Sequence, residues 1–233
     1  MVRYKETIVE ELFDNISPFY DLLNDILSFG IHRLWRRKAL KLLNPKSGQV
    51  YVDICCGTGD MAILLSKKVQ PNGKVIGIDY AKKTLLIASK KAIKKNILNI
   101  EWLYLNALNT GLKSQYFDGG SIAYGLRNVD NPAIALNELF RILKPNGRVV
   151  ILDFYRFKEK TIGEKFQSIY LRNFVIPIAS IFGLKSEYEY IENSLKSFPS
   201  GDQQMKLALN IGFSKAEYIP LTFNQMGILF LIK

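Results

Sequence analysis

The chain has 233 residues, of which 48% are hydrophobic and 23% charged, as expected for one compact domain with a substantial core. Its most apolar late stretch, from Phe174 to Leu184, is shorter than the roughly 20 residues that span a bilayer, so no membrane span is expected. The first seven residues have mixed charge and no apolar run, which argues against a secretory signal or an acid-poor transit peptide.

The formal net charge of +11 is compatible with binding to nucleic acid or to an anionic membrane surface, and does not choose between them. Part of this basicity is discounted, because Lys, Ile and Asn are abundant throughout, as an AT-rich genome would produce. Cys55 and Cys56 are adjacent and cannot join distant segments, and nothing around the single His32 has the spacing of zinc ligands. We therefore expect reduced thiols, no metal and a cytosol-like compartment.

Hydrophobic periodicity divides the chain into four regions. Residues 1–45 show the period of short helices and predict an N-terminal helical cap. Alternating strand and helix patterns follow within 46–160, as in repeated βαβ units, and predict an α/β core with a parallel sheet that binds a cofactor. A helical, aromatic insertion over 161–200 is expected to contact the substrate, and 201–233 is expected to form a helix and a closing hairpin.

The predicted elements follow in chain order. Helices are expected at 13–20, 22–27, 31–43, 61–68, 82–95, 132–143 and 202–210, and strands at 50–55, 74–79, 101–105, 120–124, 147–154, 213–219 and 226–232. A turn at 144–147 is predicted to precede the fifth strand. The helix at 82–95 is rich in Lys, which we interpret as a solvated face opposite an apolar stripe, with a polyanion-binding face as the alternative.

A glycine turn, Asp53-Ile-Cys-Cys-Gly-Thr-Gly-Asp60, joins the first core strand to a helix. Gly57 and Gly59 would let the backbone approach a ligand closely, and Asp79 at the end of the next strand suits ribose hydroxyls. A nicotinamide or flavin dinucleotide fits this pattern too. However, the Asp60 carboxylate at the start of the helix would repel a pyrophosphate, which favours a ligand without phosphate.

S-adenosylmethionine is such a ligand, because it carries an ammonium and a sulfonium. We expect Asp53 and Asp60 to surround this cationic end and Thr58 to add a hydroxyl. The alternative is that Asp60 only caps the helix and Asp53 is a buried, hydrogen-bonded acid. Asn106 and Ala107, which end the third strand, could read the adenine edge, although an Asn at a strand end is often only a turn residue.

Residues after the fourth strand should face the transferred methyl group, because ligands lie beyond the carboxyl ends of such strands. The segment from Ala123 to Asn128 lacks the Asn-Pro-Pro or Asp-Pro-Pro motif of amino-group methylases of nucleic acid. It also lacks the Cys nucleophile of cytosine C5 methylases. These two classes are therefore not favoured.

Five linked motifs resemble the ubiquinone and menaquinone biosynthesis C-methyltransferases, over nearly the whole length. They are residues 13–21, 28–36, 53–60, 124–129 (Tyr-Gly-Leu-Arg-Asn-Val) and 143–147. The resemblance implies a class I S-adenosylmethionine-dependent methyltransferase. In such a fold, a Rossmann-like, mostly parallel seven-stranded sheet carries helices on both faces. The resemblance further implies methylation of a ring carbon of a prenylated quinol, with cofactor positions at Thr58, Asp79, Asn106 and Ala107.

The last residues, Met226-Gly-Ile-Leu-Phe-Leu-Ile-Lys233, depart from most of that family and look like its cyanobacterial and plastid branch, the 2-phytyl-1,4-naphthoquinone methyltransferases. This implies the methylation step of phylloquinone (vitamin K1) synthesis, in the chloroplast stroma beside the thylakoid or in a cyanobacterial cytoplasm. Demethylmenaquinol or benzoquinol remains an alternative acceptor. An RNA-associated module of the same fold is a rival from another class, although we expect no nucleic-acid partner.

Arg127 and Asn128 are the predicted catalytic residues, orienting a quinol oxygen or a water that takes the ring proton. The alternative for Arg127 is an ion pair that positions the loop. Tyr124 is expected near the substrate, and four residues are expected to build the cap over the cofactor: Tyr20, His32, Arg33 and Trp35. A general-base role for His32 is the less favoured alternative.

A long prenyl tail must be drawn from a membrane, so peripheral contact with an anionic bilayer surface is expected. The aromatic stretch of the insertion could form a tail groove or a contact surface, or could simply pack in a core. It comprises Phe166, Tyr170, Phe174, Ile176 and Phe182. The sequence leaves the oligomeric state open.

Overall fold

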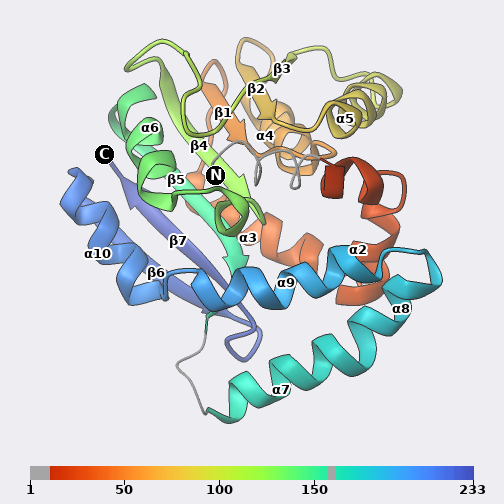
Figure 1. Ribbon diagram of the computed structural model, residues 1–233. Helices are drawn as coiled ribbons and strands as arrows, with labels where there is room; N and C mark the ends of the chain where they lie inside the picture. The colour runs from red at the N-terminus through yellow and green to blue at the C-terminus, as the bar shows by residue number, and fades with distance from the viewer. Residues whose placement is uncertain (1–10, 157–160) are drawn as a thin grey trace.

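The computed structural model describes residues 11–156 and 161–233. Within them, seven strands form one sheet in the order β3-β2-β1-β4-β5-β7-β6, with helices on both faces (Figure 1). The strands are β1 (Val50–Ile54), β2 (Lys74–Asp79), β3 (Ile100–Tyr104), β4 (Phe117–Ala123), β5 (Leu143–Phe154), β6 (Lys215–Leu221) and β7 (Met226–Ile232). Strands β1 to β5 are parallel, and β7 runs antiparallel to β5 and β6. The predicted mostly parallel α/β sheet is confirmed.

Two apolar clusters cover the two faces of the sheet. On one face, α3 (His32–Leu43) and α4 (Asp60–Val69) pack their apolar sides onto β1, β2, β5 and β7, while α5 (Lys82–Lys94) lies against β2 and β3. On the other face, α6 (Pro132–Ile142) and α10 (Gly201–Ile211) cover β4, β5 and β7. Because both faces are buried, the central strands are almost continuously apolar, as the sequence shows.

The fifth strand begins earlier than predicted. The expected turn at 144–147 lies inside β5, which starts at Leu143 directly after α6. Leu143 pairs with Phe117 of β4, and at the other edge the backbone N–H of Asn146 donates to the carbonyl of Lys233 at 3.1 Å. These partners lie far away in sequence, so the local turn signal could not reveal that the segment is held in the sheet.

A third apolar cluster lies apart from the sheet and joins the cap to the insertion. It packs α2 (Tyr20–Ser28) against the helical segments α7 (Ile162–Tyr170), Leu171–Val175, α8 (Ile176–Ile181) and α9 (Lys185–Ser197). The predicted aromatic stretch is divided between roles: Tyr170, Phe174 and Phe182 are packed in this cluster, whereas Phe166 is exposed. Among the described residues, every helix is too short or too polar to cross a bilayer.

Candidate active site

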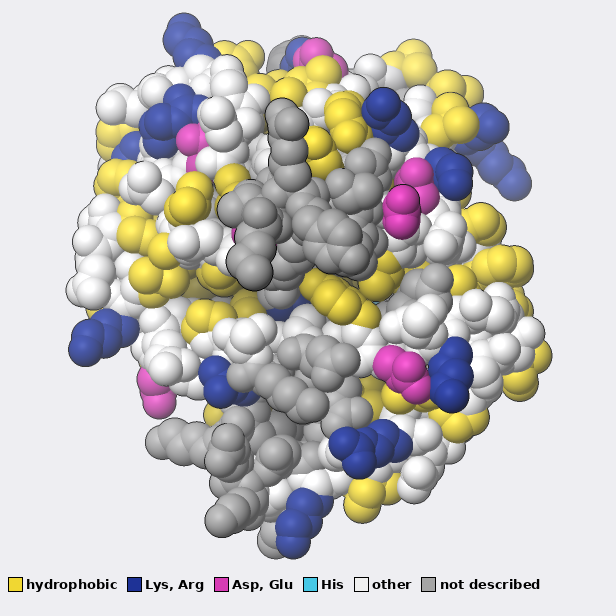
Figure 2. Space-filling model, viewed as in Figure 1, with side chains coloured by type: hydrophobic (Ala, Val, Ile, Leu, Met, Phe, Trp, Pro, Cys, Tyr) yellow, Lys and Arg dark blue, Asp and Glu magenta, His cyan; other side chains and the backbone are white. Residues whose placement is uncertain are grey.

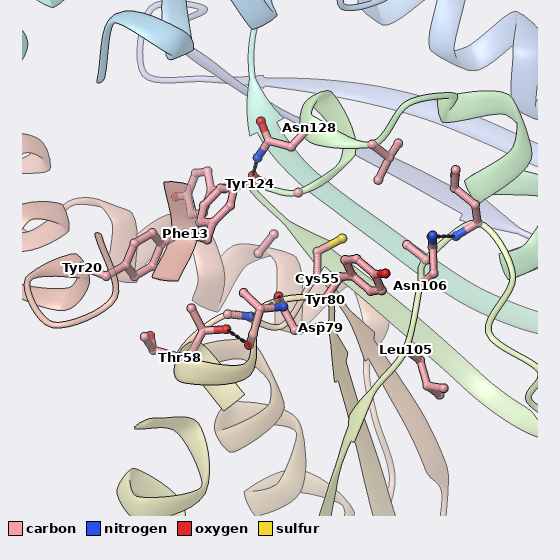
Figure 3. A pocket seen from close by; sticks show the side chains of 18 of the residues that line it. Phe13, Tyr20, Cys55, Thr58, Asp79, Tyr80, Leu105, Asn106, Tyr124 and Asn128 are labelled. Atoms are coloured by element: carbon pink, nitrogen blue, oxygen red, sulfur yellow. Dashed lines mark hydrogen bonds between the residues drawn. The ribbon is translucent and has the colours of Figure 1, made fainter. Parts of the chain in front are cut away.

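Two cavities meet at the carboxyl ends of the parallel strands. The first, which we call the donor cavity, holds about 880 Å³ of empty space including its open mouth, and the second, the acceptor cavity, holds about 1350 Å³. Phe13, Tyr20, Tyr124 and Asn128 line both cavities. Figure 3 shows these four side chains gathered at one end of the donor cavity, so they form the junction between the two.

The glycine turn forms the floor of the donor cavity. Gly57 has a φ of +51°, and its N–H donates to Oδ2 of Asp79 at 2.7 Å. A Cβ at Gly57 would meet no atom within 4 Å, so the space above it is left for a ligand. Burial raises the pKa of Asp79 to about 6, although its hydrogen bonds from Gly57 and Ala81 oppose this shift.

Four of the predicted cofactor residues line the donor cavity besides Gly57: Thr58, Asp79, Asn106 and Ala107. Thr58 Oγ1 donates to Oδ1 of Asp21 on α2 at 2.7 Å, which ties the cap to the turn. Asn106 Oδ1 accepts from the N–H of Leu108 at 2.8 Å, the turn geometry that was its alternative interpretation. Asn106 therefore both shapes the strand end and faces the cavity.

Gly59 and Asp53 belong to the same turn but are not among the residues that line the cavities. A Cβ at Gly59, whose φ is +83°, would lie 2.5 Å from the ring of Trp102 on β3, so Gly59 lets the start of α4 pack closely against this strand. Asp53 is buried and accepts hydrogen bonds from Ser121 Oγ at 2.6 Å and the Ala62 N–H at 2.9 Å. Burial raises its pKa to about 7. Asp53 is thus the buried, hydrogen-bonded acid of the alternative interpretation.

Asp60 also differs from the expectation that it meets a cationic ligand. Its carboxylate is bound by Lys91 of α5 at 2.5 Å and by Arg36 of α3 at 3.4 Å, and it does not line either cavity. Burial acts to raise its pKa, but Arg36 and Lys91 outweigh burial and hold the pKa below the usual value. Arg36 and Lys91 therefore supply the positive charge that a cationic ligand was expected to supply to Asp60, and Arg36 reaches it because the cap helix α3 packs beside the start of α4.

Arg127 and Asn128 both line the acceptor cavity, on the segment after β4. Arg127 NH1 donates to Asp153 Oδ1 at 2.7 Å and to the carbonyl of Tyr124 at 2.9 Å. The ion pair that was the alternative role is therefore present. Asn128 Nδ2 donates to the same carbonyl at 3.1 Å. Within the described residues, Arg127 Nε, Asn128 Oδ1 and Tyr124 Oη are buried without a hydrogen-bond partner.

The predicted cap residues divide into two groups. Tyr20, His32 and Trp35 line the acceptor cavity, whereas Arg33 points to solvent and pairs with Asp25. The His32 ring lies between Asp25, 2.6 Å from Nε2, and Arg36, which contacts Nδ1. Burial, together with Arg36, lowers the pKa of His32 despite Asp25. A neutral ring that accepts from Arg36 and donates to Asp25 satisfies both contacts.

Several residues at the site were missed by the sequence reasoning. The donor cavity is also lined by Tyr80, Thr84 and Asp130, and the acceptor cavity by Tyr188 and Tyr190 of α9. Tyr80 directly follows Asp79, so its position after the strand was a usable signal. The tyrosines of α9 carried none, because their approach depends on how the insertion folds over the sheet. The described residues contain no group of three or more His, Cys, Asp or Glu side chains suited to a metal.

The sequence profile of the ubiE/COQ5 methyltransferase family matches residues 1–233. The chain belongs to this family. It is 43% identical over 222 residues to the 2-phytyl-1,4-naphtoquinone methyltransferase of Synechococcus elongatus, covering 95% of each chain. It is 38% identical to the chloroplastic 2-phytyl-1,4-beta-naphthoquinone methyltransferase of Arabidopsis thaliana, covering 93% of this chain and 84% of the relative. The predicted family, the methyltransferase class and S-adenosylmethionine as methyl donor are thereby confirmed.

Solved structures support the fold independently. A methyltransferase from Thermotoga maritima, described as a possible histamine N-methyltransferase, superimposes with a TM-score of 0.66 at 21% identity, covering 96% of this chain and 99% of that one. A methyltransferase from Aquifex aeolicus gives a TM-score of 0.62 at 19% identity, covering 84% and 88%. Both are described as S-adenosylmethionine-dependent. The class I methyltransferase fold predicted from the sequence is confirmed.

The two glycines of the turn allow a matched test. Gly57→Ala should cost about 1–2 kcal/mol of stability from its left-handed backbone, and should weaken binding of S-adenosylhomocysteine because the methyl group enters the donor cavity. Gly59→Ala adds the clash with Trp102, so we expect a larger loss, roughly 2–5 kcal/mol. Urea unfolding and titration calorimetry measure the two effects. Unchanged affinity in Gly57→Ala would contradict the placement of the donor above this turn.

Proposed function

We propose that this chain methylates a ring carbon of 2-phytyl-1,4-naphthoquinol, the methylation step of phylloquinone synthesis. The observation that carries this is the large apolar acceptor cavity, which opens onto the donor cavity at the four junction residues. A lipophilic ring could there reach a methyl donor while its tail lies among apolar side chains. The named relatives, at 38–43% identity, are methyltransferases of this kind of substrate. Demethylmenaquinol or benzoquinol is the second candidate acceptor.

The donor residues proposed are Gly57, Thr58, Asp79, Asn106 and Ala107. Asp79 presents a carboxylate where ribose hydroxyls would lie, and Gly57 leaves open space beside it. S-adenosylmethionine supplies a methyl group that is already electrophilic. The protein must therefore chiefly bring an electron-rich ring carbon into line with this group and exclude water from the junction. The reduced quinol is the better nucleophile, because its oxygens donate electron density to the ring.

After methylation, the ring carbon must lose its proton. Arg127 is too basic to accept that proton near neutral pH. We propose instead that the quinol hydroxyl releases its proton to water as the ring carbon takes the methyl group, which leaves a neutral ring ketone. Arg127, fixed by Asp153, then stabilises the negative charge that returns to this oxygen when the ring carbon loses its proton to water. Asn128 Oδ1, buried without a partner in the described structure, would accept a hydrogen bond from a quinol hydroxyl or from the water that takes the proton.

We further propose peripheral contact with a membrane. Three exposed aromatic residues form a rim at the acceptor cavity: Phe29 and Phe166, which line it and are 73% and 59% exposed, and Phe223, which is 95% exposed beside the lining residue Thr222. The surrounding segments carry no acidic residue at 26–52, 165–186 or 218–233. Figure 2 shows several basic side chains and hydrophobic patches on the lower part of this face, with acidic side chains beside some of them. Such a surface suits anionic lipid.

The cellular location follows from the relatives as a proposal. One relative is chloroplastic, and others come from cyanobacteria, including Nostoc and Synechococcus elongatus. We propose that the protein works in the chloroplast stroma beside the thylakoid, or in the cytoplasm of a cyanobacterium.

The acceptor is tested by supplying labelled S-adenosylmethionine with reduced naphthoquinol, reduced benzoquinol or total RNA. We expect label in the naphthoquinol, and little when the oxidised quinone replaces it, because the quinone ring is electron-poor. Preference for benzoquinol would move the protein to the second candidate. Transfer only to RNA would overturn the proposal.

The role of Arg127 is tested by comparing Arg127→Met with Asp153→Asn. Removing a group that stabilises transition-state charge should lower kcat about 10²–10³-fold with a smaller change in KM. Asp153→Asn keeps the guanidinium and should lose less. Steady-state kinetics with a tailless naphthoquinol, on variants whose folding is verified by circular dichroism, give both values. Equal losses would assign Arg127 to loop positioning alone.

The rim is tested by Phe223→Ser, with Leu98→Ser as the control, since Leu98 is also highly exposed but lines neither cavity. Wild-type protein should pellet with anionic phospholipid vesicles at low salt and be released at high salt. Phe223→Ser should pellet several-fold less and keep normal activity on a tailless quinol. Wild-type protein that ignores vesicles at every salt concentration would contradict membrane contact.

A further inference from the structure

One lysine of α5 does not follow the expectation of a solvated face. Lys82, Lys83, Lys90 and Lys94 are exposed, but the side chain of Lys91 is only 21% exposed. Its Nζ lies 2.6 Å from Asp21 Oδ2 on α2 and 2.5 Å from Asp60 Oδ1 on α4. Lys91 thus joins the cap to the core through two carboxylates that would otherwise repel each other.

The contacts of Lys91 continue to the substrate-binding surfaces. The second oxygen of Asp21 accepts from Thr58, which lines the donor cavity. The residue before Asp21 is Tyr20, one of the four junction residues. We call Lys91, Asp21, Asp60 and Thr58 the clasp. It connects the start of α2, where the two cavities meet, directly to the glycine turn, which we now call the donor turn because it forms the floor of the donor cavity.

The charge of Lys91 is secure at neutral pH. Burial acts to lower its pKa, but Asp60 and Asp21 outweigh burial and hold it above the usual value. Arg36 also contacts Asp60, so Asp60 keeps one cation if Lys91 is removed. Asp21 would keep only the Thr58 hydroxyl among these contacts. Loss of Lys91 therefore acts mainly on the attachment of α2.

The far side of α2 is held by a different force. Leu23 and Leu27 are buried in the third apolar cluster, against the helices of the insertion. This packing does not involve the clasp, so α2 should stay folded without Lys91. Without Lys91, the first helical turn of α2 should instead shift its position relative to the glycine turn.

We propose that Lys91 is a positioning residue for methyl transfer, holding α2 on the donor turn so that Tyr20 stays at the junction and the cap stays closed over the bound donor. Lys91 lines neither cavity and so acts through Asp21 and Asp60. The inference rests on the proposed function only in taking the glycine turn as the donor site. Removing Lys91 should speed release of the donor and its product, and should misalign the acceptor.

The test compares Lys91→Met with Lys91→Arg and with Lys90→Met, an exposed lysine on the same helix. Titration calorimetry and stopped-flow fluorescence, with Trp35 of the cap as reporter, measure the binding and release of S-adenosylhomocysteine. We expect Lys91→Met to bind about tenfold more weakly through faster release, Lys91→Arg to recover most of the affinity, and Lys90→Met to match wild type. High salt should weaken binding in the wild type but hardly in Lys91→Met.

Asp21→Asn removes the same attachment from the other side and keeps the Thr58 contact, so it should reproduce the weaker binding even if Lys91→Met folds poorly. Wild-type affinity and release rate in a folded Lys91→Met or Asp21→Asn protein would overturn the proposal, as would a loss in Lys90→Met equal to that in Lys91→Met. These experiments measure only the binding and release of S-adenosylhomocysteine. Their result can therefore be interpreted even if the naphthoquinol assay fails.

Discussion

The partly buried carboxylate of Asp60 is the charge on which the arrangement of the site depends. It lies at the first turn of α4, where the helix dipole favours an anion, and a carboxylate that is largely shielded from water also needs cationic partners. Arg36 comes from the cap and Lys91 from the core, so satisfying Asp60 brings α3 and α5 to the same point. The cap thereby closes one side of the donor cavity, and the junction with the acceptor cavity forms beneath it.

The two cavities rest on different parts of the fold. The donor cavity is built from strand ends and the turns that follow them, which the hydrogen bonds of a sheet buried on both faces hold rigid. The acceptor cavity is built largely from α2, α3, the insertion helices and the β6–β7 hairpin. Most of these helices pack in a separate apolar cluster. The acceptor side can therefore differ between relatives without disturbing the sheet that forms the donor cavity.

Sequence patterns predicted correctly those features that depend on residues close together in the chain. The runs of apolar residues located β2 and β7 at their observed bounds, and a glycine turn between strand and helix was enough to place Gly57 and Asp79 at the cavity. Asp60 could not be assigned in this way, because its partners come from helices 24 residues before it and 31 after it. The hydrogen bond that holds Asp53 could not be predicted for the same reason, since Ser121 lies on another strand. Sequence spacing reveals which side chains follow a strand, but not which distant side chains neutralise them.

Several unsatisfied polar atoms lie close together on the segment after β4. Leaving a buried donor or acceptor unpaired costs about 1–3 kcal/mol, so a folded chain retains few of them. In the described structure Tyr124 Oη, Asn128 Oδ1 and Arg127 Nε are such atoms, within four residues of one another, and others lie on the cap helices, at Asn24 Nδ2 and Arg36 Nε. Tyr124 also has a left-handed backbone, with a φ of +63°. Because Tyr124 and Asn128 line both cavities and Arg127 is fixed by Asp153, this cost falls where a quinol could supply the missing partners.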